Sequence, residues 1–225
     1  MGCQDNKTKQ NQQQNLEKRI LTEKENISSE KNQKEKDSVP PIKKLKQEEL
    51  MPFLYEYGEE NPQTRALIQT KFGDMEVELF EDTPLHRANF IYLTHLNYYN
   101  TTLFYRVDPG FVIQAGNSDK RETSRMRKSI GNFLIPKEFK AHHQHHYGAL
   151  AAAKFTKQNV SKASSPFEFY IVMDKNGAHH LDNEHTVFGR VVKGMEVAEE
   201  ISKAETEKGG EWPMQDIELK VKILN

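Results

Sequence analysis

The sequence predicts a mostly β domain that follows a polar N-terminal tail. Short apolar stretches separated by turn residues recur between residues 66 and 223, and only two helical patterns interrupt them. Strands and helices do not alternate in the way that builds a parallel sheet. Many short strands with few helices are typical of an antiparallel barrel or sandwich.

The composition explains the tail. Hydrophobic residues make up 36% of the chain, which is below the usual globular share, and the deficit lies at the N-terminus. Residues 1–40 are mainly Gln, Asn, Lys and Glu, so they cannot bury enough apolar surface to fold, and we expect them to be disordered. No apolar run is long enough to span a bilayer.

A helical extension is predicted over residues 41–63, ahead of the domain at 64–225. Four apolar residues lie at helical spacing: Leu50, Phe53, Leu54 and Tyr57. We expect Pro52 to bend or restart this helix, and the extension to pack on the domain.

The domain begins with a predicted β-hairpin over residues 66–80, in which apolar and acidic residues alternate on the second strand and Gly73-Asp74 supplies the turn. A helix is predicted over residues 81–97, with Thr83 as its N-cap. Further strands are predicted at 103–107, 111–116, 168–173, 186–192 and 216–223, and a second helix at 195–205.

The run LFYRVDPGFVIQAGN, residues 103–117, carries the most chemical information. If Arg106 and Gln114 lie on adjacent antiparallel strands, their side chains share a face, and the amide oxygen of Gln114 can orient the guanidinium. The ring of Phe111 would lie beside them.

This run resembles the signature of the cyclophilin family, F-H-R-V-I-P-G-F-M-I-Q-G-G-D. Further stretches are similar to other family motifs in the same order: TPLHRANFIYL, YYNTTLFYR, YGALAAAK, KASSPFEFYIVMDKN and HLDNEHTVFGRVVKGMEV. The resemblance runs from about Arg65 to the C-terminus. Several separated motifs in order are more specific than one short pattern.

The resemblance implies an eight-stranded antiparallel β-barrel capped by two helices, with a groove on its outer face. It implies peptidyl-prolyl cis/trans isomerase activity on proline-containing polypeptides without a cofactor, with Arg106 as the catalytic residue and Gln114 as its orienting partner. The proline pocket falls on Phe111, Val112, Phe169, Leu181 and His185. Ala153 matches a position whose backbone binds the peptide.

Four positions depart from the family pattern. Glu168 stands where glutamine is usual, and we expect its carboxylate near Arg106, either competing with substrate or fixing the guanidinium. His180 replaces the tryptophan that favours cyclosporin binding, and Lys154 replaces an asparagine of the groove. Val112 replaces methionine, a volume change that the pocket can absorb.

These residues suit bond rotation better than bond cleavage. Rotation about a peptide bond has a barrier of about 18–20 kcal/mol because it breaks amide resonance. The twisted prolyl nitrogen regains its lone pair, to which a fixed guanidinium such as that of Arg106 can donate. The alternatives are a weakly active peptide-binding chaperone or scaffold and, third, a histidine-rich metal carrier.

Two further clusters are predicted to be surface loops. The stretch AHHQHHYG supplies His142, His143, His145 and His146. It lacks a closed ligand set, and Glu138 is not obviously placed to complete one, so we predict no metal site beyond adventitious chelation. The stretch 121–129, RETSRMRKS, is predicted to be a solvated or substrate-steering loop, because a net charge of -1 gives no reason to expect nucleic acid.

The N-terminus suggests a lipid anchor. Cys3 is the only cysteine, which excludes an internal disulfide. Met1-Gly2-Cys3 before a polar linker resembles the end of a bacterial lipobox; a myristoyl and palmitoyl start is disfavoured because Asn6 stands at its Ser/Thr position. We therefore expect a protein anchored in a bacterial cell envelope, periplasmic or at the outer membrane, or a cytoplasmic protein if Cys3 is unmodified. We assume that it is a monomer.

Overall fold

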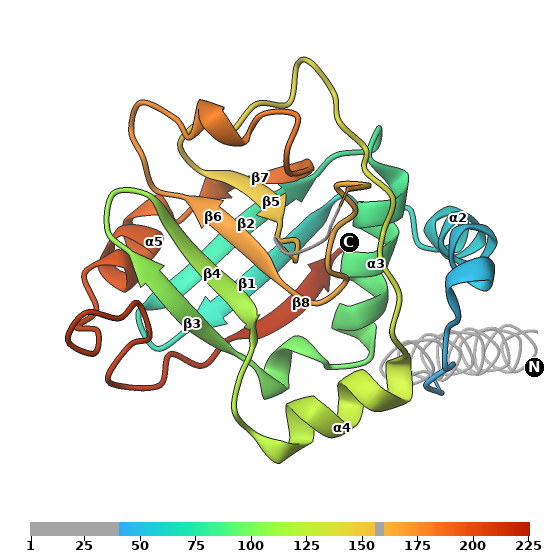
Figure 1. Cartoon of the computed structure of the whole chain (residues 1–225), viewed down its shortest axis with the longest axis horizontal. Helices are drawn as coiled ribbons and strands as arrows, with labels where there is room; N and C mark the ends of the chain where they lie inside the picture. Colours follow the sequence, from blue (N-terminus) through green and yellow to red (C-terminus); the bar gives the residue numbers. More distant parts are fainter. Residues whose placement is uncertain (1–40, 156–159) are drawn as a thin grey trace, which may run out of the picture. The chain divides into compact units, whose positions relative to one another are not determined.

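The computed structural model describes residues 41–155 and 160–225, which form one eight-stranded antiparallel sheet with four α-helices around it (Figure 1). This confirms the mostly β, antiparallel fold class. The predicted disordered tail, residues 1–40, lies outside the described residues. In the described part of the chain, no helix has both the length and the apolar character that crossing a bilayer requires.

The elements follow one another along the chain as short strands with helices between them. The strands are β1 (Arg65–Thr70), β2 (Gly73–Leu79), β3 (Leu103–Asp108), β4 (Val112–Asn117), β5 (Ala149–Ala152), β6 (Phe169–Val172), β7 (Val187–Lys193) and β8 (Lys220–Leu224). The helices are α2 (Leu50–Glu60), α3 (Pro84–His95), α4 (Arg121–Ile130) and α5 (Met195–Ser202), with 3-10 turns η1 (Gln47–Glu49), η2 (Tyr99–Thr101) and η3 (His179–Leu181).

The strands are ordered β3-β4-β6-β5-β7-β2-β1-β8, and every neighbouring pair is antiparallel. The predicted hairpin is β1–β2, but its turn lies two residues earlier than expected, at residues 71–72. Gly73 already pairs with Thr70, and it is needed because its φ of +130° is unfavourable for other residues.

The sheet curls so that its two ends approach each other. Leu103 on β3 bridges Glu218, just before β8, and Val107 donates its backbone N–H to the carbonyl of Glu211 at 2.7 Å. The segment that precedes β8 is thereby laid along the outer edge of β3. This contact brings Glu211 to the strand that carries Arg106.

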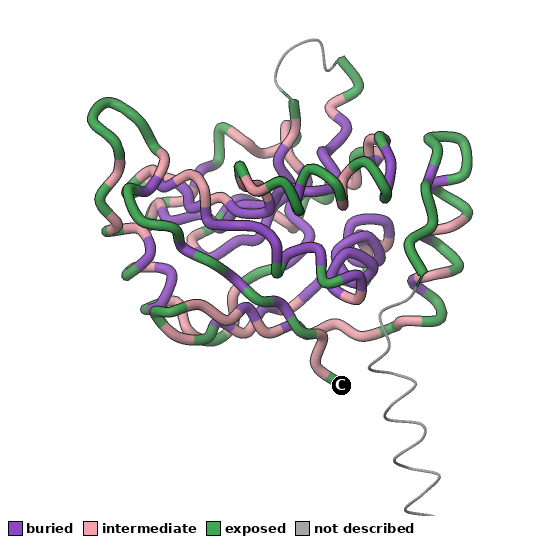
Figure 2. Tube along the Cα trace, turned by 90° about the horizontal axis from the view of Figure 1, so that it is seen from below, coloured by how far each residue is buried: buried purple, intermediate pink, exposed green. Residues whose placement is uncertain are grey.

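The main core lies between the inner face of the sheet and α3. Phe90 on α3 packs against Tyr99, Phe169 and Phe188, with ring centroids 5.0, 5.6 and 5.8 Å away. Figure 2 shows the buried residues gathered in the interior and the exposed ones on the outer loops and helix faces. Helix α3 is buried on nearly all sides because α2 covers the side turned away from the sheet (Figure 1).

Helix α2 lies within the predicted extension and is continuous through Pro52, so the expected bend does not occur. Pro52 occupies the first turn, where a backbone N–H has no partner within the helix. The helix is held on α3 by ring contacts of Phe53 and Tyr57 with Tyr92, and by a 2.7 Å hydrogen bond between Tyr57 Oη and His95 Nδ1.

The N-terminus of α3 is capped from a distant part of the chain. Thr83, the predicted N-cap, makes no side-chain cap and instead donates to the carbonyl of Phe80. The carboxylate of Glu138 accepts from the backbone N–H groups of Leu85 and His86, both at 3.0 Å, and from His86 Nδ1 at 2.6 Å. A carboxylate is favourable there because the N-terminus of a helix carries partial positive charge.

The predicted basic loop at 121–129 is helix α4, so this expectation and that of only two helices are wrong. Its inner face is formed by Thr123, Met126, Arg127 and Ile130, of which Thr123 and Ile130 are fully buried. Polar residues at two of these four positions leave no apolar period in the sequence, which is why the helix was missed.

Arg127 connects α4 to the sheet. Its Nη2 donates to the carbonyl of Gly116 at 2.7 Å and to Glu168 Oε1 at 2.8 Å, and its Nε donates to Tyr98 Oη at 2.7 Å. The other carboxylate oxygen of Glu168 accepts from the hydroxyl of Ser165. Because the Glu168 side chain is only 8% exposed, these contacts satisfy a charge that would be costly to bury alone.

We expect Arg127→Met to lower the free energy of unfolding by about 3 kcal/mol or more, because it leaves a buried carboxylate without a cation. In the double variant Arg127→Met/Glu168→Gln most of this loss should be recovered. Arg125→Met, at an exposed position of the same helix, is the control and should change little. Urea denaturation followed by circular dichroism measures all three; equal stabilities of the two single variants would contradict this role for Arg127.

Candidate active site

Arg106 and Gln114 are directly paired across β3 and β4. The turn between these strands carries Phe111, and Arg106 Cζ lies 5.7 Å from the centroid of its ring. The structure therefore brings together the three residues singled out from the signature run. The guanidinium is neither buried nor free in solvent, since 28% of the Arg106 side chain is exposed.

Two carboxylates hold the Arg106 guanidinium. Its Nε lies 2.5 Å from Glu211 Oε2, and its Nη2 lies 3.1 Å from Glu211 Oε1 and 3.2 Å from Asp108 Oδ2. The hydrogen bond that Arg106 donates to the Glu211 carboxylate is the main reason that the pKa of Arg106 is raised. Among the described residues, no group accepts a hydrogen bond from Nη1, so this end of the guanidinium is available to a ligand.

Gln114 does not orient Arg106 as expected. Its Nε2 donates to the hydroxyl of Tyr105, and its amide oxygen makes no hydrogen bond to the guanidinium within residues 41–155 and 160–225. The ring of Tyr105 packs against Trp212 at 5.6 Å. Glu211 and Asp108 thus take the orienting role that the sequence assigned to Gln114, because the segment before β8 lies against β3.

Glu168 also lies elsewhere than expected. Its carboxylate pairs with Arg127 on α4 and not with Arg106. Glu168 directly precedes β6, and its side chain points towards α4. It therefore neither competes for Arg106 nor fixes it.

A second apolar cluster covers the outer face of the sheet next to Arg106. Its buried members are Val112, Ala149, Ala151, Ala153, Tyr170, Val172, Ala178 and Val187, and Phe80, Phe111 and Leu181 pack on it partly exposed. We call this set the outer apolar patch.

Phe169 does not belong to the outer apolar patch, which corrects the sequence-based assignment. Its side chain is 1% exposed and packs in the main core against Phe90 and Tyr99. Successive residues of a strand point to opposite faces, so the neighbouring Tyr170 occupies the outer face instead. The assignment was wrong by one residue in register along β6.

Tyr170 belongs to a buried polar chain beneath the outer apolar patch. Its hydroxyl lies 3.0 Å from His145 Nε2, and His145 Nδ1 lies 2.7 Å from Asp182 Oδ1, which also accepts the backbone N–H of His145. His145 is fully buried, and burial is the main reason that its pKa is lowered. The chain fixes the position of the Tyr170 ring.

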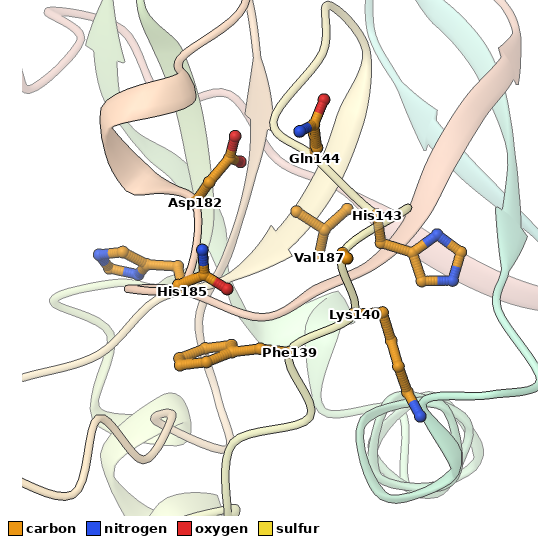
Figure 3. Close-up of a pocket in the computed structure, with 9 residues that line it drawn as sticks. Phe139, Lys140, His143, Gln144, Asp182, His185 and Val187 are labelled. Atoms are coloured by element: carbon orange, nitrogen blue, oxygen red, sulfur yellow. The ribbon is translucent and has the colours of Figure 1, made fainter.

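Two further predicted groove residues, His185 and His180, lie beside Tyr170 and Phe111. His185 lies edge-on to Tyr170 with ring centroids 5.6 Å apart, and its Nδ1 is 3.1 Å from the carbonyl of Ala152. The exposed ring of His180 stacks on Phe111 at 5.4 Å. A small pocket opens behind His185, and Figure 3 shows Asp182, Phe139 and Val187 around it.

Ala153 and Lys154 are more constrained than the sequence implied. The backbone of Ala153 donates to the carbonyl of Glu168 at 3.0 Å and accepts from the N–H of Ser165 at 2.8 Å. Lys154 Nζ lies 2.8 Å from Glu184 Oε2. Hydrogen bonds from Lys154 and Lys162 lower the pKa of Glu184 to about 2.

The sequence did not predict that Tyr170, His145 and Glu211 form part of the site. Strand alternation against the buried Ile171 is a signal that could have found Tyr170. No sequence pattern points to Glu211, because it is separated from Arg106 by 105 positions and lies outside any strand.

Comparison with known proteins places the chain in one family. The family model for cyclophilin type peptidyl-prolyl cis-trans isomerase/CLD matches residues 65–223. A cyclophilin type isomerase of Cryptosporidium parvum, solved in the presence of the dipeptide Ala-Pro, has a TM-score of 0.60 at 23% identity, and the match covers 72% of this chain and 99% of that one. At that identity the likeness concerns the fold.

Several curated relatives exceed 30% identity. The peptidyl-prolyl cis-trans isomerase-like 3 of Dictyostelium discoideum is 34% identical over 68% of this chain and 90% of its own length. The peptidyl-prolyl cis-trans isomerase A of Dickeya dadantii is 33% identical over 72% of this chain and 82% of its own length. The chain therefore belongs to the cyclophilin-type peptidyl-prolyl cis-trans isomerases, a family of enzymes.

Proposed function

We propose that the protein accelerates rotation of X–Pro peptide bonds in unfolded or exposed protein segments, and that Arg106 stabilises the twisted amide. The observation that carries the proposal is the position of the guanidinium: it lies beside Phe111 at the rim of the outer apolar patch, with Nη1 available. The outer apolar patch suits a proline ring, and the Ala-Pro dipeptide present with the Cryptosporidium protein supports ligands of this class.

Catalysis of this rotation requires only that the twisted amide is bound more tightly than either planar isomer. X–Pro bonds exchange over tens to hundreds of seconds unaided, and no covalent bond is made or broken during the rotation. A donor that reaches the pyramidal prolyl nitrogen interacts with the twisted state and not with either planar isomer. One charge-assisted hydrogen bond contributes about 1.5–3 kcal/mol, which corresponds to roughly 10- to 100-fold in rate.

Glu211 and Asp108 set the direction of the donor. An arginine side chain otherwise samples many rotamers, and freezing it costs up to about 2 kcal/mol. Because Nε and Nη2 are both bound by carboxylates, this cost is met before a peptide arrives, and the Nη1 end is left for the substrate. We infer that the carboxylates preorganise Arg106.

The outer apolar patch is kept uncharged. Burial is the main cause that lowers the pKa of His185 to about 4, so its imidazole is neutral at physiological pH. A neutral imidazole beside Tyr170 presents ring edges to a bound proline and adds no charge that would need hydration.

A second function, a weakly active peptide-binding chaperone or scaffold, is favoured by the same carboxylates. If the twisted amide needs the Nε or Nη2 protons, Glu211 and Asp108 compete with it and turnover is slow. The effect of removing Glu211 separates the two functions.

The remaining predictions concern segments or states outside this site. Cys3 lies outside the described residues, so the lipid anchor and the cell-envelope location stay predictions, as does the monomeric state. We propose proline-containing polypeptides at the bacterial envelope as the substrates that such an anchor would reach.

Arg106→Ala is expected to lower kcat/KM for a short X–Pro peptide by roughly 10- to 100-fold, because the donor to the prolyl nitrogen is lost. A protease-coupled assay measures this. Arg190→Ala is the control, because Arg190 is an exposed arginine paired with Glu78. Equal rates of Arg106→Ala and the unmodified protein would exclude the catalytic role.

Glu211→Ala is expected to lower kcat/KM by about threefold to tenfold, because the guanidinium regains the rotamer freedom that the carboxylate removes. Glu207→Ala, an exposed acidic position in the same segment, should leave the rate within twofold. A rate increase in Glu211→Ala would show that the carboxylate competes with substrate, and would favour the binding function.

Activity should be constant from about pH 8 to 5.5 and should fall only as the pH approaches 4. The sign follows from the lowered pKa: the folded protein favours neutral His185, so the pocket gains charge only when the pH nears the pKa of about 4. The pH profile of kcat/KM measures this, with His185→Gln as the comparison. A fall centred near pH 6.5 that disappears in His185→Gln would contradict a buried neutral imidazole.

A further inference from the structure

Two histidines and an aspartate that are far apart in sequence meet on the surface beside β2. Asp82 lies between β2 and α3, whereas His142 and His143 lie between α4 and β5. His142 Nε2 is 2.9 Å from Asp82 Oδ2, and His143 Nε2 is 2.7 Å from Asp82 Oδ1. One ligand atom from each residue lies within 4.8 Å of the other two.

Part of this cluster is held in place by packing. The ring of His143 stacks on Phe80 with centroids 3.9 Å apart and an interplanar angle of 13°, and its side chain is only 14% exposed. Asp82 and His142 are more open, with side chains 40% and 68% exposed. One nitrogen ligand is therefore fixed, while the two others can adjust to an ion arriving from solvent.

The three ligand atoms of the cluster lie outside the polar chain of the groove, although His143 also lines the small pocket beside His185. His145, two residues further along the chain, is turned inward to Asp182 and Tyr170. Figure 3 shows the His143 ring pointing away from Asp182 and His185. The side chains of the histidine-rich stretch thus point in two directions. His142 and His143 face Asp82, whereas His145 is buried beneath the outer apolar patch.

We propose that Asp82, His142 and His143 bind one divalent transition-metal ion of the zinc class. Imidazole nitrogens suit Zn²⁺, Co²⁺, Ni²⁺ and Cu²⁺, whereas Mg²⁺ and Ca²⁺ prefer all-oxygen sites. Two imidazoles and one carboxylate supply three protein ligands, which leaves a fourth position of a tetrahedral ion to water.

Metal binding would replace the contacts that now join these side chains. Each imidazole Nε2 would turn its lone pair to the ion and carry its proton on Nδ1, so neutral imidazoles lose no proton overall. The carboxylate would exchange hydrogen bonds for coordination. The sequence singled out His142 and His143 as candidate ligands but not Asp82, because the carboxylate comes from a separate loop.

The proposal is tested by isothermal titration of Zn²⁺ into the full chain carrying Cys3→Ser, which removes the thiol as a ligand. We expect one ion per chain, and a loss of affinity of about tenfold or more in Asp82→Asn and in His143→Ala. The matched control is His146→Ala, an exposed histidine of the same stretch outside the cluster, which should change affinity less than about twofold. Co²⁺ absorption provides an independent readout of imidazole coordination.

Two outcomes would overturn the proposal. No measurable Zn²⁺ binding would show that the cluster is a hydrogen-bonded clamp between two loops. An equal loss in His146→Ala and Asp82→Asn would show diffuse chelation by the histidine-rich stretch. Circular dichroism and metal-free thermal unfolding of each variant establish that it is folded, and Asp82→Asn keeps the shape of the side chain it replaces.

Discussion

The ion pair between Glu211 and Arg106 is the contact on which the proposed chemistry depends. It exists because the sheet curls until the segment before β8 runs along β3. There the backbone N–H of Val107 donates a 2.7 Å hydrogen bond to the carbonyl of Glu211. If the two ends of the sheet lay further apart, Arg106 would keep only its ion pair with Asp108 on the same strand. The topology of the sheet is therefore also what aims the guanidinium.

The alternation of side chains along each strand creates the two environments that the site needs. Inward residues such as Phe169 build a rigid aromatic core with α3, and outward residues such as Tyr170 and Val112 build the outer apolar patch. Polar chains support both: Glu138 caps α3, and His145 holds the Tyr170 ring. The strands that carry the site residues thus pack on the main core with their inner face, which restricts the movement of these residues.

The sequence predicted the antiparallel fold and most strands, because period-two alternation and turn residues are local signals. It also predicted that Arg106, Gln114 and Phe111 lie together, since they flank one turn. It failed wherever a partner came from a distant segment, as with Glu211 on Arg106 and Asp82 beside His143. It failed too where polar residues do the packing, as with Arg127 on α4, because a hydrophobic period is then absent.

The central claim is that Arg106 acts on the twisted amide and not on peptide binding. The most direct test is two-dimensional NMR exchange spectroscopy on an X–Pro peptide, which yields the catalysed cis/trans exchange rate, combined with a titration that yields peptide affinity, for the unmodified protein and Arg106→Lys. Lysine keeps the charge and lacks the planar fork. The account predicts an unchanged affinity and an exchange rate at least about tenfold lower; an unchanged exchange rate at equal affinity would contradict it.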